Sequence, residues 1–340
     1  MRKLASIRKV AELKPIAGAD LIELALVDGW QCVVKKNELA VGDLAVYCEV
    51  DSLLPVQERF EFLRTSSYKK LPTGAEGFRL KTMRLRGQLS QGLLLPLAVL
   101  GPLATPPLEG DDVTDLLGIT KYDPPLPAAL SGVAKGVFPA WLPKTDEERI
   151  QNCWADLPKD ADYVITEKLH GTSATFYLRD GEFGLCSRNL DLLPDAGGLY
   201  TDVAVALDVE AKIRAYAAAT GRSAGLALQG EIIGEGINGN YYRIAGRQLF
   251  LFNVFDEATG YLPPAAASLA VQHMGLQEVP VLDAAYRLPA TCAAALAQAE
   301  AASIFMEQPV REGIVLRHYP ASGPRVSCKI ISNQHLLKEK

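Results

Sequence analysis

Five segments in the second half of the chain place charged or nucleophilic side chains inside or beside apolar stretches. Lys168 follows the strand-like residues 162–166 and stands in the sequence EKLHG, which ends in a glycine turn. A lysine in that place can be held in a pocket, where a neighbouring cation lowers its pKa and frees the amine as a nucleophile. Taken alone the pattern is weak, because an ordinary surface lysine before a turn would show it too.

The other four segments supply further groups that nucleotidyl transfer requires. Arg188 lies in SRN, Glu231 in QGEIIG and Phe252 in FLFNVFD, and the last segment pairs EGIVLR (312–317) with SCKIIS (327–332). Individually, an acidic residue in a strand is more often exposed to solvent, and an aromatic triplet is more often core. Together the segments offer a nucleophile, cations for an α-phosphate, carboxylates for a metal and a ribose, and an aromatic face for a base.

In order and wording, these segments resemble the covalent nucleotidyltransferase superfamily of polynucleotide ligases and capping enzymes over about residues 140–332. EKLHG is similar to the RNA-ligase branch, because DNA ligases typically have aspartate at the position of His170 and capping enzymes usually show Lys-Thr-Asp-Gly. Residues 29–47 and 81–97 resemble the OB-type domain that precedes the catalytic domain in a bacterial, Deinococcus-type branch. With no NAD-type preamble and no zinc-finger cysteines evident, the resemblance favours ATP over NAD.

The resemblance implies an ATP-dependent RNA ligase that seals 3′-hydroxyl and 5′-phosphate ends of RNA, or of a nicked duplex that contains RNA. Lys168 would attack the α-phosphate of ATP and carry the AMP as a covalent lysyl-AMP. Glu231 would hold the ribose hydroxyls, and Phe252 would stack on adenine. Arg188 would act in catalysis by contacting the ribose or the incoming 5′-phosphate.

The carboxy-terminal segments would complete the site that the resemblance implies. Glu312 would support binding of Mg²⁺ or Mn²⁺, and Lys329 would neutralise the α-phosphate. Glu167, His170 and Arg317 would join the nucleotide-binding set. Some relatives have Lys-x-Lys in the last motif, whereas this chain has serine at the first position. The missing charge is therefore expected to come from Arg317 or from the metal.

Two other functions compete with RNA ligation. A GTP-using guanylyltransferase of the capping type would be labelled by GTP rather than by ATP. A non-catalytic RNA-binding protein would need no intact set of lysines and carboxylates, so the presence of Lys168, Glu231, Glu312 and Lys329 argues against it.

The elements around these segments predict an α+β fold. Apolar alternation indicates strands over 161–166, 173–179, 226–233, 249–255, 313–317 and 325–331, and helices over 201–219, 263–273 and 289–304. Strands and helices do not alternate regularly, so antiparallel sheets flanked by helices are expected rather than a doubly wound parallel sheet. Residues 121–340 would form this nucleotidyltransferase domain.

Residues 1–120 read instead as an OB-type β-barrel made of short strands. A hairpin is predicted over 21–36 with its turn at Asp28-Gly29, and further strands over 43–50 and 78–97, with a bulge near Thr82. The net charge of the chain is −5, but residues 59–86 hold eight basic and two acidic residues. This bias predicts a nucleic-acid surface. Its expected members share the strand region before the linker and are Arg79, Lys81, Arg84 and Arg86.

Composition limits where the protein works. No apolar run approaches the ~20 residues of a membrane span, and no charged-then-apolar leader opens the chain. The six cysteines form no CxxC pair and lie far apart, which favours reduced thiols and no zinc site. A cytoplasmic monomer without a membrane partner is expected.

Overall fold

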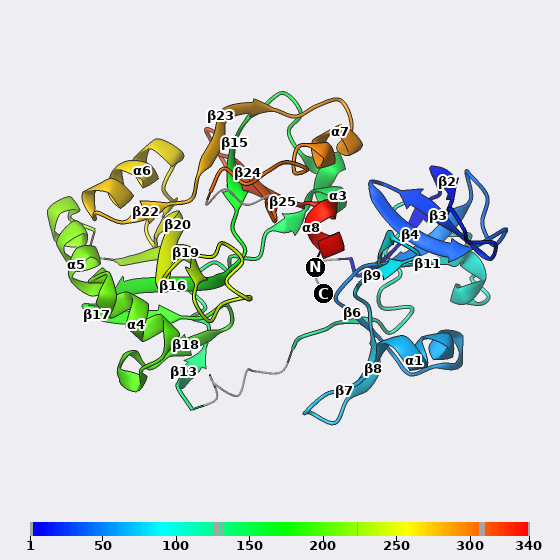
Figure 1. The fold of residues 1–340 in the computed structure, drawn as a ribbon, viewed down its shortest axis with the longest axis horizontal. Coiled ribbons are helices and arrows are strands. Elements are labelled where there is room, and N and C mark those ends of the chain that lie inside the picture. The colour runs from blue at the N-terminus through cyan, green and yellow to red at the C-terminus, as the bar shows by residue number, and fades with distance from the viewer. Residues whose placement is uncertain (1–2, 125–129, 131, 223, 306–309, 339–340) are drawn as a thin grey trace. The chain divides into compact units, whose positions relative to one another are not determined.

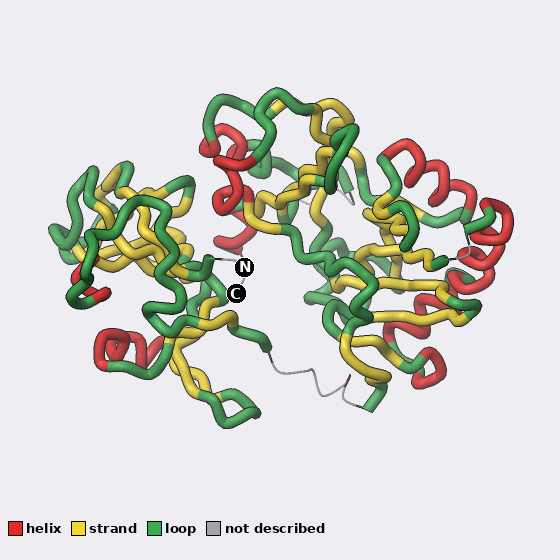
Figure 2. The backbone as a smooth tube through the Cα atoms, turned by 180° about the vertical axis from the view of Figure 1, so that it is seen from behind, coloured by secondary structure: helices red, strands yellow, loops and turns green. Residues whose placement is uncertain are grey.

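The structure is a computed structural model, and it describes all residues except 1–2, 125–129, 131, 223, 306–309 and 339–340. The chain forms two compact units (Figures 1 and 2). Unit 1 comprises Met1–Pro125 with Leu336–Lys340, and unit 2 comprises Leu126–His335.

Unit 1 consists of short strands in small sheets, as expected of a barrel-like domain (Figure 1). The sheet orders are β1-β5-β11, β2-β3-β4, β12-β6-β8-β7 and β10-β9. The strands are β1 (Ala5–Lys9), β2 (Glu12–Pro15), β3 (Ile22–Val27), β4 (Trp30–Lys35), β5 (Leu44–Cys48), β6 (Ser52–Leu54), β7 (Tyr68–Lys70), β8 (Glu76–Arg79), β9 (Thr82–Leu85), β10 (Gln88–Gln91), β11 (Leu93–Pro96) and β12 (Thr120–Lys121). One short helix, α1 (Arg64–Ser67), lies between β6 and β7.

Turn chemistry decides how these strands join. The predicted β3–β4 hairpin is confirmed, because Asp28 and Gly29 both have positive φ, 46° and 81°, as a two-residue hairpin turn requires. The expected bulge near Thr82 is wrong. β8 ends at Arg79, and β9 starts at Thr82 in a different sheet, so the chain changes sheets there.

Unit 2 contains two sheets of mostly antiparallel strands. The eight-stranded sheet has the order β13-β18-β17-β16-β19-β20-β21, with β22 paired to β20, and the five-stranded sheet has the order β14-β25-β24-β15-β23. The strands of the first are β13 (Ala134–Val137), β16 (Thr172–Arg179), β17 (Glu182–Cys186), β18 (Leu190–Leu192), β19 (Gly225–Gly234), β20 (Arg247–Asp256), β21 (Gly260–Tyr261) and β22 (Gln277–Glu278). Those of the second are β14 (Glu148–Arg149), β15 (Asp162–Lys168), β23 (Val281–Arg287), β24 (Gly313–His318) and β25 (Val326–Ile331).

The helices of unit 2 differ from expectation at two places. The described helices of unit 2 are α3 (Ile150–Cys153), α4 (Leu199–Ala206), α5 (Val209–Thr220), α6 (Pro264–His273) and α7 (Cys292–Ala297). A further helix, α8 (Asn333–Lys338), begins in unit 2 and ends in the part of the chain that belongs to unit 1. The single helix expected over 201–219 is broken, because Asp208 adopts a left-handed conformation with φ 52°. The helix expected over 289–304 stops after six residues. Just beyond its end, the carboxylate of Glu300 accepts hydrogen bonds from the Asn333 backbone and the Ser332 hydroxyl.

Each sheet of unit 2 has one face covered by helices. α4, α5 and α6 bury apolar residues against the eight-stranded sheet, and α3 and α7 do the same against the five-stranded sheet (Figure 1). Side chains alternate between the two faces of a strand, so on β15 Ile165 enters the helix-covered core, whereas Thr166 and Lys168 share the other face. The functional residues discussed below gather on that other face.

Candidate active site

Lys168 is the last residue of β15 and lies beside carboxylates from both sheets. Its Nζ is 2.5 Å from Oε1 of Glu312, and the second oxygen of Glu312 is 3.4 Å from Nδ1 of His170. Lys168 pairs in register with Gly313, which places Glu312 at the mouth of β24 directly next to it. Glu231 on β19 accepts a hydrogen bond of 3.2 Å from the Gly171 backbone. The structure thus brings together four of the residues that the sequence singled out.

Burial and neighbouring charges shift the pKa values of Lys168, Glu312 and Glu231. Burial lowers the pKa of Lys168, but the charges of Glu312 and Glu231 raise it by more, so its pKa lies above the ordinary value. Burial raises the pKa of Glu312, but the interactions with Lys168 and His170 lower it by more, so that it lies at about 2. Burial raises the pKa of Glu231 to about 7, against the opposing charge of Lys168. The expectation that a cation depresses the pKa of Lys168 is wrong here, because the carboxylates outweigh the smaller effect of Arg149.

Lys329 on β25 behaves in the opposite way. Burial, and then the positive charges of Lys168 and Arg149, lower the pKa of Lys329 to about 8. Among the described residues, no carboxylate lies within ion-pair distance of Lys329. Arg149 stands opposite Lys329 in the parallel pairing of β14 with β25. Three cations therefore share one small region, where a phosphate group would stabilise all of them.

Arg149 is a member of this cluster that the sequence did not reveal. It lies in TDEER, before the first of the five segments, and no motif marks it. Only the pairing of β14 with a strand some 180 residues further along brings it to the site. Arg188 is more peripheral: its side chain is 61% exposed and its Nη2 is 2.5 Å from Oδ1 of Asp146. Its charge still contributes to the lowered pKa of Lys329.

Phe252 lies further along the same cleft, in a cavity of about 580 Å³. Residues of both sheets line it, including Thr166 and Arg317. Arg317 is 5% exposed and its Nη1 donates to Oγ1 of Thr166 at 2.9 Å. The guanidinium also lies 5.7 Å from the centre of the Phe252 ring. Arg317 lies four residues along β24 from Gly313, the residue that pairs with Lys168. This separation is about 13 Å by strand rise, so Arg149 is closer than Arg317 to the lysines.

The carboxylate of Glu167 points away from this cleft. It is buried, accepts from the Ser303 hydroxyl and the Ile304 backbone, and has a pKa raised by burial. Since Glu167 is adjacent to Lys168 on β15, strand alternation sends the two side chains to opposite faces. The Glu167 side chain therefore holds the segment at 303–305 in place.

Comparison with known proteins identifies the family. The model of the RNA ligase family matches residues 161–331, and an OB-fold domain model matches residues 4–97. The chain belongs to the RNA ligase family. Unit 1 accordingly holds an OB-fold domain, and the α+β architecture expected from the sequence is confirmed. No curated protein matches the ligase.

Solved structures of the RNA ligase from Naegleria gruberi resemble the ligase along its whole length. A mutant of Naegleria gruberi RNA ligase with AMP and Mn is 39% identical, with 99% of each chain covered and a TM-score of 0.83. The same enzyme with pyrophosphate is 39% identical, with 99% of each chain covered and a TM-score of 0.82. Another of its mutants, with ATP and Mn, is 38% identical, with 99% of each chain covered and a TM-score of 0.83.

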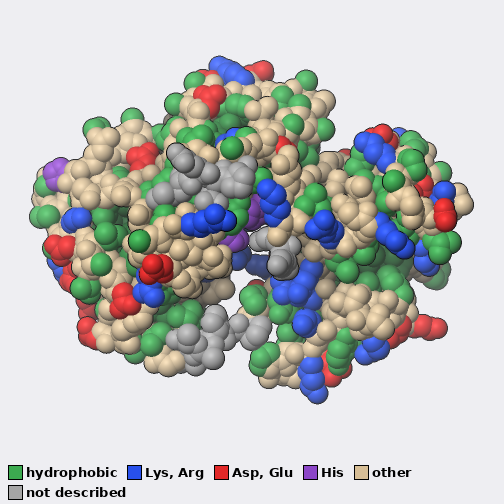
Figure 3. All heavy atoms as spheres, in the orientation of Figure 1, with side chains coloured by type: hydrophobic (Ala, Val, Ile, Leu, Met, Phe, Trp, Pro, Cys, Tyr) green, Lys and Arg blue, Asp and Glu red, His purple; other side chains and the backbone are tan. Residues whose placement is uncertain are grey.

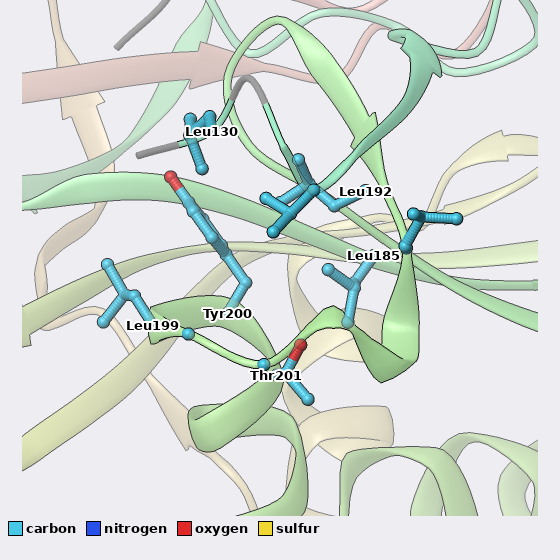
Figure 4. A pocket seen from close by; sticks show the side chains of 10 residues that line it. Leu130, Leu185, Leu192, Leu199, Tyr200 and Thr201 are labelled. Atoms are coloured by element: carbon cyan, nitrogen blue, oxygen red, sulfur yellow. The ribbon is translucent and has the colours of Figure 1, made fainter. Parts of the chain in front are cut away.

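A second cavity of the ligase does not suit a nucleotide. It measures about 260 Å³ and is lined by residues of β17 and α4 and by nearby leucines (Figure 4). Leu185, Leu192 and Leu199 dominate its wall, and the polar side chains are the hydroxyls of Tyr200 and Thr201. No charged side chain lines it among the described residues, so a triphosphate would lose its hydration there without any compensation.

The basic residues expected to bind nucleic acid all lie in unit 1, where Figure 3 shows exposed lysine and arginine side chains on the face it displays. Lys81, Arg84 and Arg86 are exposed, and Arg86 occupies the two-residue turn between β9 and β10. Arg79 is partly committed to the fold, because it pairs with Asp51 at 3.1 Å and stacks over Tyr122 at 4.0 Å. None of the described helices is long and apolar enough to span a membrane.

The carboxylates of the site fit a divalent cation bound mainly through other ligands. Among the described residues, no group of three or more His, Cys, Asp or Glu side chains forms a ready metal cage. Glu231 and Glu312 nevertheless interact, since the charge of Glu312 helps to raise the pKa of Glu231. Mg²⁺ is usually bound by one or two carboxylates together with water and phosphate oxygens, and this arrangement suits that habit.

Proposed function

We propose that the ligase seals RNA ends in three steps, with Lys168 as the residue that receives AMP from ATP. The observation that carries this assignment is the contact of Lys168 Nζ with Glu312 at 2.5 Å, in a cluster that also holds Lys329. Thr166, two residues before Lys168 on the same face of β15, lines the Phe252 cavity. An amine, carboxylates and cations are thereby arranged around one point. An aromatic face suited to a base lies further along the cleft.

In the first step the Lys168 amine forms a bond to the α-phosphorus, and the bond from that phosphorus to the pyrophosphate oxygen breaks. The amine must first lose a proton, because its pKa is raised by the neighbouring carboxylates. Glu312 Oε1 accepts the hydrogen bond from Nζ and so holds the amine in place. A Mg²⁺ or Mn²⁺ ion held by Glu312, with Glu231 nearby, would offset phosphate charge and compete for the carboxylate that stabilises the lysine proton.

Lys329 and Arg149 act on charge in this step. In a displacement at phosphorus, a protein contributes mainly by positioning the reacting groups and stabilising their charge. Both cations lie close enough to interact electrostatically with Lys168. They could therefore stabilise the negative charge of the α-phosphate and of the leaving pyrophosphate. Arg149 would supply the charge that the serine in the last motif lacks. Glu231 would hold the ribose and Phe252 would stack on adenine, with Arg317 and Thr166 lining the same cavity.

The second and third steps repeat the same chemistry with other partners. The RNA 5′-phosphate oxygen takes the AMP, and the bond from Lys168 Nζ to phosphorus breaks. A 3′-hydroxyl then attacks the activated 5′-phosphorus and expels AMP. Arg188, the most exposed cation of the site, is placed to meet the incoming 5′-phosphate. The Naegleria structures with ATP, AMP, pyrophosphate and Mn support the use of ATP and a divalent ion.

Residues 1–120 would form the domain that holds the polynucleotide, and residues 121–340 the catalytic domain. OB folds commonly bind single-stranded nucleic acids along a basic groove, and Lys81, Arg84 and Arg86 provide exposed charge. Replacing these three by glutamine should weaken binding of a nicked RNA duplex and flatten its salt dependence. Equal salt slopes for the variant and the wild type would assign RNA binding to another surface.

The remaining proposals concern the substrate, the cellular compartment and the oligomeric state. A nicked duplex that contains RNA is the proposed substrate. All six cysteines are free thiols, which supports a reducing compartment such as the cytoplasm. A monomer is proposed.

The test is label transfer from α-³²P-ATP, followed by sealing assays on matched RNA and DNA nicks. We expect a label on the protein from ATP with Mg²⁺ or Mn²⁺ that is stable to alkali and labile to acid, as a lysine phosphoramidate is, its release by pyrophosphate, and sealing of nicks that contain RNA. Labelling by GTP in place of ATP would indicate a capping-type guanylyltransferase. RNA binding without any label would indicate a non-catalytic protein.

A further inference from the structure

The loop that joins β19 to β20, residues 235–246, has an unusual backbone. Its sequence is EGINGNYYRIAG, and left-handed φ values recur along it. The residues with positive φ are Gly236, Asn238, Gly239, Asn240, Arg243 and Gly246. Non-glycine residues hold such conformations only where surrounding contacts over-determine them. The positions of these contacts therefore indicate what the loop is built to do.

Part of the contacts are internal to the loop. Asn240 donates from Nδ2 to the Ile244 carbonyl at 2.8 Å and accepts from the Ile244 backbone at 3.2 Å. The rings of Tyr242 and Phe305 meet edge to face at 5.6 Å, and Ile244 packs in the same apolar cluster. The loop thus holds its own shape, so it can position other groups.

The remaining contacts reach the turn that follows Lys168. The Tyr242 hydroxyl accepts a hydrogen bond of 2.8 Å from the His170 backbone. Asn238 donates from Nδ2 to the Gly171 carbonyl at 2.7 Å, and Glu231 accepts from the Gly171 backbone at 3.2 Å. His170 and Gly171, the second and third residues after the nucleophile, are therefore held by side chains from residues 231–242.

Gly171 shows how closely the turn is held. A Cβ at this position would lie 2.3 Å from the Ile232 carbonyl oxygen, a separation that no side chain tolerates. The turn and the end of β19 are therefore in direct backbone contact. The same turn carries His170, which lies 3.4 Å from Glu312, so a displaced turn would disturb the carboxylate that accepts from the Lys168 amine.

We propose that Tyr242 and Asn238 are positioning residues for the Lys168 nucleophile, acting through the backbone of the turn at 170–171. This inference rests on the proposed role of Lys168. In-line attack needs the amine within a narrow range of distance and angle, and Lys168 has a long flexible side chain whose direction is set by its backbone. Tyr242 is 3% exposed, and burial raises the pKa of its hydroxyl, which stays neutral and keeps its acceptor lone pairs.

The proposal predicts a defect in one step of the reaction. Tyr242→Phe keeps the ring in its cluster and removes only the acceptor for the His170 backbone. We expect lysyl-AMP formation at saturating ATP to slow about tenfold, because one buried hydrogen bond is lost. KM for ATP should change less than about threefold, since the ribose and base contacts remain. Sealing of a nick that already carries the 5′-adenylate should stay near the wild-type rate, because that step does not use Lys168 as a nucleophile.

Tyr241→Phe is the matched control. Tyr241 is the neighbouring residue, it also loses a hydroxyl in this variant, and its hydroxyl donates to the Val310 carbonyl rather than to the turn. Its lysyl-AMP formation should stay within about twofold of wild type. Asn238→Gly, at an exposed position with φ 43°, serves as a second variant that removes the donor without straining the left-handed backbone, and should slow lysyl-AMP formation several-fold.

Four results decide the question. Equal losses in lysyl-AMP formation and in sealing of the adenylylated nick would overturn the proposal and show a general structural role. Equal behaviour of Tyr242→Phe and Tyr241→Phe in lysyl-AMP formation would also overturn it. If the wild-type ligase forms no lysyl-AMP, the proposed function fails and the positioning role fails with it. Wild-type lysyl-AMP with a normal Tyr242→Phe rate removes the positioning role alone.

Discussion

At one end of the cleft in unit 2, Lys168, Lys329 and Arg149 lie close together beside Glu312, whereas at the other end Glu147 lies between Arg317 and Arg325. Both ends are rich in charged side chains that are largely buried. They differ in how completely the charges are matched by partners within the protein.

At the Arg317 end most charged and polar groups have a partner within the protein, although the buried Nε of Arg317 donates no hydrogen bond to the described residues and burial lowers the pKa of this guanidinium. Arg325 donates to Asn253 at 2.6 Å, approaches Glu147 at 3.3 Å and stacks over Tyr261 at 3.7 Å. Asn253 donates in turn to Gln229, so the network ties β20 and β19 to the segment before β25. The side chains of Glu147 and Arg317 are 14% and 5% exposed.

At the Lys168 end, burial and neighbouring charges shift the pKa values of the site residues. The pKa of Lys329 is lowered to about 8, that of Glu231 is raised to about 7, and that of Glu312 is lowered to about 2. Strongly shifted pKa values cluster at functional sites, where a bound ligand can neutralise the unmatched charges. We infer that the Arg317 end stabilises the fold of the cleft, and the Lys168 end is arranged for a nucleotide phosphate.

The largest effect is expected at Lys168. Lys168→Ala and Lys168→Arg should each abolish labelling by α-³²P-ATP, because neither side chain offers an amine that can bond to phosphorus at neutral pH. Thermal unfolding measured by circular dichroism should remain close to wild type. A normal level of labelled protein in either variant would remove Lys168 as the nucleophile.

The carboxylates beside it should affect rate more than stability. Glu312→Gln and Glu231→Gln should each slow lysyl-AMP formation by ~10²–10³-fold, as commonly found when one electrostatic group of a site is removed. Single-turnover labelling gives the rate, and a melting curve recorded in parallel gives the stability. Rates within a few-fold of wild type in a folded variant would place these carboxylates outside the chemistry.

Glu147→Gln should show the reverse pattern. It leaves two buried guanidinium groups without a carboxylate, and loss of one partner of a buried ion pair costs about 3–5 kcal/mol. The midpoint of urea unfolding should fall, while lysyl-AMP formation by the folded protein should change only a few-fold. Glu182→Gln, at an exposed position on β17, is the control and should leave the midpoint unchanged. A large rate loss with normal stability would contradict the division between the two ends.

The smallest effect concerns pH. The pKa of Lys329 is lowered to about 8, so the residue loses its positive charge as pH rises through that value. KM for ATP should therefore rise several-fold between pH 7 and 9. Lys168, with a raised pKa, stays mostly protonated over the same range, and its deprotonation should make kcat increase with pH. In Lys329→Arg the rise in KM should shrink, because arginine keeps its charge. An unchanged rise would exclude Lys329 as its source.

Much of the strand framework of unit 2 could be predicted from the sequence. Alternating apolar residues located the strands around Lys168, Glu231, Phe252 and Lys329 to within a few residues. The helices were less well predicted. Alanine at 292–301 favours helix locally, but Glu300 forms tertiary contacts with the chain at 332–334, which no local pattern contains.

The sequence by itself determined which residue types could do chemistry here, because motif wording depends on neighbours along the chain. It did not determine the direction in which the pKa of Lys168 is shifted, the presence of Arg149 beside Lys329, or the position of Arg317 beside Thr166. Those depend on strand pairings and on which face of a strand each side chain occupies. Coulombic interactions depend on distance in space rather than on separation in sequence, so only the tertiary structure could decide them.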